Sequence, residues 1–188
     1  MIEFAYFVLA LSWSPEYCAS PNGARDRLQC AERRYGFVTH GLWPQHERGY
    51  PRDCAASPPP VAESLVRSML DIMPSPALVR HEWRSHGTCS GLGAEGYFAL
   101  VRKAHAGVRI PAEFQNPTQW VTIAPAELKR RFVAENAGYG AGSLAVVCNG
   151  RNLREVRVCL TKDLKPRACG ADVRDQCRAE KAVLRPVR

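Results

Sequence analysis

Several signatures of familiar protein classes are absent from this chain of 188 residues. It has no Gly-x-Ser-x-Gly motif, and so it lacks the nucleophile elbow of a serine hydrolase. It has no nucleotide-binding P-loop and no Cys-x-x-Cys pair, which removes the usual signature of a zinc ribbon or a thioredoxin-like site. The apolar run over residues 4–11 is far too short to cross a bilayer, and we expect no membrane association.

Basic tails, internal repeats and long low-complexity segments are missing as well. The net charge is nevertheless +8, and a surplus of this size favours a polyanionic partner such as nucleic acid, an anionic membrane or an acidic polysaccharide. The length suits one domain, which we expect to span residues 1–188.

Cysteine is abundant, with eight residues in an even number at wide spacings. This usage is typical of an exported, oxidised protein with four disulfides, although spacing alone leaves the connectivity open. We therefore expect a periplasmic or secreted protein. The run 4–11 has neither the basic leader nor the cleavage site of a signal peptide, so we expect the signal to have been removed from this sequence.

Apolar periodicity divides the chain into strands and helices. A run that is apolar on both faces predicts a central strand, and alternation of valines with charged residues near the end predicts a half-buried one. The predicted strands are 4–11, 35–43 with a turn at Gly41, 143–148 and 152–160, and the predicted helices are 61–72, 77–87, 94–106 and 124–136. Residues 15–30 and 44–60 are predicted loops. The expected fold is α+β, with several helices packed on an antiparallel sheet.

Four of the five histidines lie in two short clusters, THGLWPQH and HEWRSHGTC. On a helix with about 100° per residue, His81, Glu82 and His86 share one broad face, and Glu82 is close enough to touch His86 four residues later. We expect this carboxylate to favour the protonated form of His86 and to hold its orientation. Gly87 would end the helix and leave His86 at an exposed end.

Three interpretations of the second cluster compete. A zinc site requires His-Glu-x-x-His, whereas the spacing here is one residue longer and splays the two rings by about 140°. Surface histidines with a helical salt bridge are the plain alternative, but Gly, Thr and Cys follow the cluster at once. The third interpretation is acid–base catalysis, because two imidazoles near neutral pKa can accept and donate a proton in one turnover.

The first cluster supplies the second imidazole, His40, at the end of a predicted strand where its side chain can project into a cleft. Trp43 is either a core residue or an aromatic that stacks on a nucleobase beside His40, and Tyr50 is either a loop aromatic or a second face of that slot. We expect His46 and His105 to be surface residues without partners.

With these residues in place, the sequence resembles the ribonuclease T2 family of acid endoribonucleases. The stretches YFVLALSWSPEYC, FVTHGLWPQ and HEWRSHGTC are similar to the family's first strand and its two active-site segments. The ending VVCNG…LREVRVCL, with its later cysteines, is similar to the family's last strands. Both active-site segments occur in order, which makes the resemblance specific.

The resemblance implies cleavage of single-stranded RNA without a metal or other cofactor. His86 would be the general base that takes the proton of a ribose 2′-OH, and His40 the general acid that protonates the departing 5′-oxygen, leaving a 2′,3′-cyclic phosphate. Glu82 and His81 would steady the charge that develops on the phosphate, and Trp43 would stack on a base with Tyr50 as partner. The need for a 2′-OH makes DNA inert, and we expect a monomer.

Two positions depart from the family pattern. Ser85 stands where the family usually has a lysine that stabilises negative charge, and Arg84 lies about 60° outside the catalytic arc, from where its long side chain would have to reach back. Gln45 stands where some members have an acidic base-reading residue, and an amide both donates and accepts hydrogen bonds. We therefore expect low or broad base specificity, and slower turnover than usual if Arg84 does not reach the phosphate.

The resemblance also implies the disulfides Cys18–Cys30, Cys54–Cys89, Cys148–Cys177 and Cys159–Cys169. The bridge between Cys54 and Cys89 would hold the two histidine segments together. The alternative from another class is a non-catalytic secreted module that binds RNA or another polyanion. The missing lysine at position 85 favours that module, whereas the presence of His40, Glu82 and His86 favours the enzyme.

Overall fold

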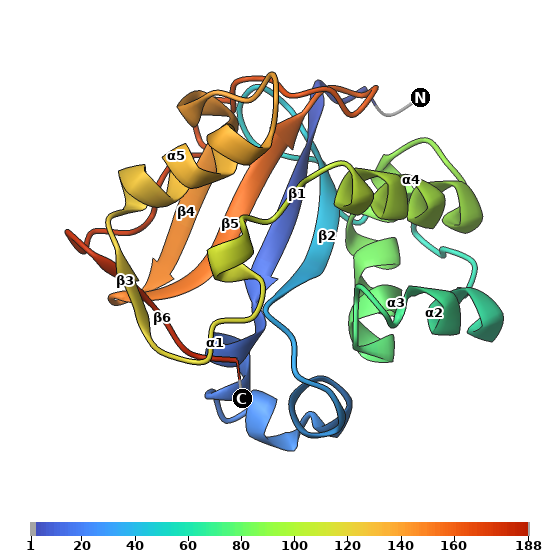
Figure 1. Cartoon of the computed structure of the whole chain (residues 1–188). Helices are drawn as coiled ribbons and strands as arrows, with labels where there is room; N and C mark the ends of the chain where they lie inside the picture. The colour runs from blue at the N-terminus through green and yellow to red at the C-terminus, as the bar shows by residue number, and fades with distance from the viewer. Residues whose placement is uncertain (1–2, 188) are drawn as a thin grey trace.

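The computed structural model describes residues 3–187 and has a six-stranded sheet at its centre (Figure 1). The strand order is β2-β1-β5-β6-β3, and β4 pairs with β5 off this path. Only β5 and β6 run parallel, through one pair, so the sheet is mixed rather than purely antiparallel. The strands are β1 (Tyr6–Trp13), β2 (Phe37–Gln45), β3 (Val121–Ile123), β4 (Leu144–Asn149), β5 (Asn152–Leu160) and β6 (Ala182–Leu184).

Strand β1 lies between β2 and β5, as its apolar run predicts. Its residues are buried on both faces except Ser12, which is half-buried. One face of the sheet, with Phe7, Leu9 and Leu11 of β1, forms the main core under the helices. Alternation along a strand then sends the residues between them to the opposite face. That second face carries the candidate site.

Within residues 3–187, five α-helices accompany the sheet: α1 (Ser14–Cys18), α2 (Glu63–Met69), α3 (Pro76–Ser85), α4 (Ala94–Ala106) and α5 (Pro125–Glu135). In Figure 1, α5 lies across β4 and β5, whereas α2, α3 and α4 gather beside β2. Helix α3 begins where the Ser75 hydroxyl accepts a hydrogen bond from the Leu78 amide, an ordinary N-cap. This cap fixes the helix that carries the second histidine cluster.

Two expectations from the sequence were wrong, and two strands were missed. Gly41 does not make a turn, because β2 continues to Gln45. Residues 15–30 are not simply a loop, since they include most of α1, a 3-10 turn (Gly23–Arg25) and the start of a π-helical turn (Leu28–Glu32). The short strands β3 and β6 were not anticipated, because three residues are too few for a visible alternation pattern.

Four disulfides join Cys18 to Cys30, Cys54 to Cys89, Cys148 to Cys177 and Cys159 to Cys169, the pairs that the family resemblance implies. The Cys54–Cys89 bridge ties the loop after β2 to the turn after α3. None of the helices within residues 3–187 has the length and apolar character needed to span a membrane.

Candidate active site

The candidate site forms where the second face of the sheet meets the end of α3. On this face Ser12 pairs with Glu155, and the backbone at Ala10 pairs with Arg157. His40 lies in a β-bulge of β2, since Leu11 pairs with Thr39 and Ala10 pairs with Gly41. A bulge leaves one residue unpaired and re-aims its side chain, and here that residue is His40.

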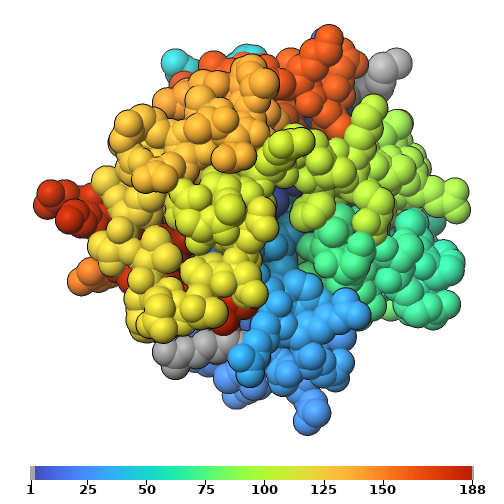
Figure 2. Space-filling model, viewed as in Figure 1, coloured from blue at the N-terminus to red at the C-terminus, as the bar shows by residue number. Residues whose placement is uncertain are grey.

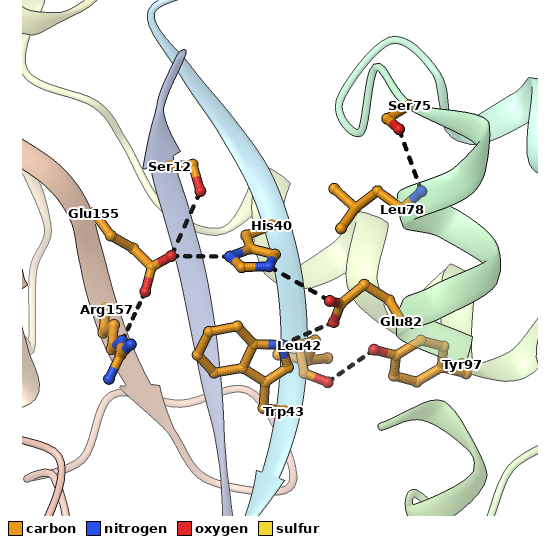
Figure 3. Close-up of polar contacts among 10 residues, drawn as sticks. All are labelled: Ser12, His40, Leu42, Trp43, Ser75, Leu78, Glu82, Tyr97, Glu155 and Arg157. Carbon is orange, nitrogen blue, oxygen red and sulfur yellow. Dashed lines mark hydrogen bonds and ion pairs between the residues drawn. The ribbon is translucent and has the colours of Figure 1, made fainter. Parts of the chain in front are cut away.

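His40 lies between two buried carboxylates, as Figure 3 shows. Its Nδ1 is 2.9 Å from Oε2 of Glu155, and its Nε2 is 3.6 Å from Oε1 of Glu82. Each carboxylate side chain is only 1% exposed. Glu155 also accepts hydrogen bonds from Nε of Arg157 at 2.7 Å and from the Ser12 hydroxyl at 3.5 Å. The imidazole is thus clamped from both sides, with Glu155 as the closer partner.

These contacts set the protonation of the trio. Burial lowers the pKa of His40, but the hydrogen bond to Glu155 and the charges of Glu155 and Glu82 outweigh burial and raise it above its ordinary 6.5. Burial alone would raise the pKa of Glu155, yet its contacts with His40 and Arg157 bring it down to about 2. Burial raises the pKa of Glu82 to about 7, only partly opposed by His40 and the Trp43 N–H. Glu155 therefore carries the charge that keeps His40 protonated.

The Glu82 side chain fills the space in which a side chain at position 41 would lie, so this position requires glycine. A Cβ at Gly41 would lie 2.0 Å from Oε2 of Glu82 and 2.5 Å from Nε1 of Trp43. The same Trp43 N–H donates to Oε2 of Glu82 at 2.8 Å. Gly41, which the sequence suggested as a turn, instead leaves the space in which the Glu82 side chain of α3 contacts β2.

Trp43 connects the two histidine clusters. Its ring centroid is 5.1 Å from that of His40, in an edge-on contact, and 5.4 Å from that of His86. The Arg157 guanidinium lies 5.3 Å from the same ring, and the Tyr50 ring is 6.3 Å from the His86 ring. His40 and His86 therefore meet at one indole, although they are on different elements.

His86 lies just past the end of α3, in the C-cap position. Burial lowers its pKa to about 4, and the positive charges of Arg52, His81 and His40 act in the same direction. Its Nδ1 is buried without a hydrogen-bond partner among residues 3–187, which leaves Nε2 to meet a substrate. The expectation that Glu82 favours protonated His86 was wrong, because the chain leaves helical geometry at His86 while Glu82 turns to β2.

The other residues predicted for the site lie around this centre. His81 is half-buried, and burial followed by the charges of Arg52 and Arg84 lowers its pKa. Arg84 is exposed, and so is Tyr50, at 53%. Gln45 is buried and its amide donates to the Pro44 carbonyl.

Ser85, at the family's lysine position, is buried and donates to Oδ1 of Asp53 at 3.1 Å. The backbone N–H of Asp53 in turn donates to the Ser85 carbonyl at 3.0 Å. His46 is half-buried. His105, expected to lack a partner, lies with Nδ1 2.9 Å from the Thr39 hydroxyl, a correction to the sequence prediction.

Three charged residues of the site were missed from the sequence: Glu155, its partner Arg157, and Arg52. The alternation in β5 predicted only that Glu155 opposes the core valines, and an outward residue on a half-buried strand is normally solvated. Arg52 lies in a loop whose position depends on the Asp53–Ser85 hydrogen bonds and on the neighbouring Cys54–Cys89 bridge. Neither the burial of Glu155 nor the position of the Arg52 loop can be predicted from neighbouring residues in the sequence.

A cavity of about 460 Å³ opens beside His40 and Glu155. Its wall includes the polar residues Ser12, Tyr17 and Arg154 and the apolar side chain of Leu78. Trp43 and His86 do not line it, so the cavity is on the His40 side of the site only. Within residues 3–187, no group of three or more His, Cys, Asp and Glu residues is arranged to hold a metal ion.

The chain is similar to known ribonucleases in sequence and to a ribonuclease-related protein in fold. A sequence profile of the ribonuclease T2 family matches residues 4–169. A ribonuclease of Aeromonas hydrophila is 37% identical over 169 residues, which cover 86% of this chain and 74% of that protein. A probable ribonuclease of Haemophilus influenzae is 34% identical over 119 residues, which cover 56% of this chain and 44% of that protein. In fold, the chain is similar to an RNase-related protein from Calystegia sepium, with a TM-score of 0.77, 21% identity and 98% of each chain covered.

Proposed function

This chain belongs to the ribonuclease T2 family and is an endoribonuclease of that type, and we propose that it cleaves single-stranded RNA by acid–base catalysis between His40 and His86. The observation that carries this proposal is the opposite effect of the site on two imidazoles that meet at Trp43. The pKa of His40 is raised and that of His86 is lowered to about 4. Between those values one ring is protonated and the other is not, as an acid and a base require.

In the first step, Nε2 of His86 takes the proton of a ribose 2′-OH while the oxygen attacks the adjacent phosphorus. The bond from phosphorus to the 5′-oxygen breaks, and His40 gives its Nε2 proton to that leaving oxygen. The contact of Nε2 with Glu82, at 3.6 Å, is loose enough to be exchanged for the leaving oxygen. The product is a 2′,3′-cyclic phosphate, which water opens in a second step with the two roles reversed.

The negative charge of the reacting phosphate requires cations near both imidazoles. Ser85 supplies none, and its hydroxyl is engaged with Asp53. The charge of Arg52 acts on both His81 and His86. Arg52 therefore stabilises the negative charge of the phosphate in place of the absent lysine, and His81 donates a hydrogen bond to the phosphate. Arg84, exposed on α3, contributes only through its longer-range charge.

Two nucleosides flank the scissile phosphate, one on each side. The cavity beside His40 takes the nucleoside that leaves through its 5′-oxygen, because His40 protonates that oxygen. Trp43 and Tyr50, beside His86, stack on the nucleoside whose 2′-OH attacks. The buried Gln45 amide offers both donor and acceptor groups, and we therefore propose low or broad base specificity. We also propose a periplasmic or secreted location, which the four disulfides and a tomato relative named an extracellular ribonuclease support. We propose further that the enzyme is a monomer, and that it does not cleave DNA because DNA lacks the attacking 2′-OH.

A direct test is digestion of yeast RNA in excess EDTA, with detection of the cyclic phosphate by ³¹P NMR. We expect the wild type to release acid-soluble product, and His40→Ala and His86→Ala to abolish it. The matched control is His46→Ala, which removes a histidine of the neighbouring loop that we assign no role and should keep full activity. Binding of RNA without cleavage by the wild type would favour the non-catalytic module, and activity that EDTA removes would indicate a metal-dependent hydrolase.

A further inference from the structure

A second cavity, of about 260 Å³, adjoins the one beside His40. Gln29 lines both cavities, and Ser14 in the second directly follows Trp13 in the first. Gln29 is buried, and its amide donates to the Ser14 hydroxyl at 3.0 Å. Helix α1 lies between the two cavities, because it contributes Pro15 and Cys18 to the second and Tyr17 to the first. The cavities are therefore neighbours across α1, and the second is not lined by either candidate catalytic histidine.

The second cavity is lined by three arginines and two aromatic rings, namely Arg33, Arg34, Arg185, Tyr35 and Trp120. Trp120 is 51% exposed, and the Arg185 guanidinium lies 5.3 Å from its ring. Arg33 and Arg34 are exposed and form no ion pair within residues 3–187. In Figure 2 the blue, yellow and dark red segments that carry these residues meet on one face.

The chain holds this group in place at several points. The Trp13 ring N–H donates to the Arg185 carbonyl at 3.0 Å, and the Arg185 Nε pairs with Glu16 at 2.5 Å. That ion pair neutralises Glu16, a residue of α1 that lines the first cavity. The Cys18–Cys30 disulfide lines the second cavity and anchors the turn that precedes Arg33.

We propose that the second cavity binds the RNA strand beyond the leaving nucleoside, on the 3′ side of the cleaved bond. Arginines beside exposed aromatic rings are the combination that binds single strands, because phosphates pair with the guanidinium groups and bases stack on the rings. The net positive charge of the wall suits a polyanion, and its place next to the first cavity sets the direction of the strand. This inference rests on the proposed function, which assigns the leaving nucleoside to the first cavity.

The test uses substrates in which one ribonucleotide is followed and preceded by 2′-O-methyl nucleotides, so that a single bond can be cleaved. For the wild type, kcat/KM should rise about five-fold or more as two or three nucleotides are added on the 3′ side, which corresponds to the lower limit for stacking of one base. Equal extension on the 5′ side should give no comparable gain. The 3′ gain should also shrink with salt, because each phosphate contact releases counterions.

Two variants of the second cavity, Arg33→Ala/Arg34→Ala and Trp120→Ala, should lose this gain while cleaving the dinucleotide at the wild-type rate. Trp120→Phe, which keeps a ring, should retain most of it. The matched control Arg174→Ala/Arg178→Ala removes two exposed arginines that line neither cavity and should behave as wild type.

A wild type that gains nothing from 3′ nucleotides, or cavity variants that keep the gain, would overturn this proposal. If the wild type cleaves no dinucleotide, the proposed function fails separately. Fluorescence anisotropy then tests RNA binding by the second cavity alone, with oligonucleotides of the same sequences in which the single ribonucleotide is also 2′-O-methylated. Binding that the cavity variants lose and the arginine control keeps would support it, and equal binding by all would refute it.

Discussion

Replacement of Glu155 by glutamine tests the assignment of His40 as the protonated partner. The substitution keeps the shape of the side chain and removes the charge that lies 2.9 Å from Nδ1 of His40. Burial then acts on the imidazole with less opposition, because Glu82 is the only other carboxylate that raises its pKa. We therefore expect the pKa of His40 to fall in this variant.

The size of the fall follows from the contact that is lost. A hydrogen bond to a charged partner contributes about 1.5–3 kcal/mol, and one pKa unit corresponds to about 1.4 kcal/mol. The pKa of His40 should therefore fall by about one to two units. Since the proposed mechanism requires His40 protonated and His86 neutral, His40 should set the alkaline limb of kcat/KM against pH and His86 the acid limb.

The assay is kcat/KM for a dinucleoside phosphate between pH 3.5 and 9. In Glu155→Gln the alkaline limb should move to lower pH by about one to two units, while the acid limb, set by His86 near pH 4, should stay. Glu95→Gln, an exposed carboxylate in the first turn of α4, is the matched control and should leave both limbs in place. A uniform loss of rate with an unmoved alkaline limb would refute the reasoning, because it would show only misplacement of the ring.

The remaining predictions concern three further features. Since the folded-state pKa of Glu82 is about 7 against an ordinary 4.5, its ionisation should cost stability as pH rises through this window, and Glu82→Gln should gain up to about 3 kcal/mol relative to wild type between pH 4.5 and 8 in urea unfolding. Arg52→Ala should lower kcat about ten-fold or more and Arg52→Lys much less, and an equal kcat in all three proteins would contradict the proposed role. Reduction of the Cys54–Cys89 bridge should lower the unfolding free energy by roughly 3–4 kcal/mol and also the activity. Full activity in a chain shown by mass to be reduced would contradict the view that this bridge aligns the histidines.

The sequence predicted the elements that rely on local pattern. The central strand, the helix at 94–106 and the helix predicted at 124–136, observed as Pro125–Glu135, all occur where apolar periodicity predicted them. The histidine clusters were also visible, because their residues are close together in the chain. These features depend on interactions within about two turns of helix or one strand.

Contacts between distant segments could not be read in the same way. Glu155 is 115 positions from His40, and alternation along β5 shows only which residues share a face, not whether that face is dry. The partner of Glu82 was misassigned for a related reason. Helical spacing predicts contact with His86, but α3 ends at Ser85 and the absent side chain of Gly41 admits Glu82 to β2.

The division of the site between two parts of the fold explains how one protein holds two imidazoles in opposite states. Glu155 on strand β5 of the sheet keeps His40 protonated by raising its pKa. At the end of α3, burial and the charge of Arg52 keep His86 neutral by lowering its pKa. The main partners of the two rings differ, although the charge of His40 also lowers the pKa of His86. Because His40 should remain protonated while His86 titrates near pH 4, the two limbs of the pH profile should move independently. Glu155→Gln shifts the alkaline limb, and loss of the charge at Arg52 shifts the acid limb upward. A double variant should therefore narrow the active pH range from both sides, by the sum of the two single shifts. Shifts that fail to add would mean that the rings titrate as one coupled pair.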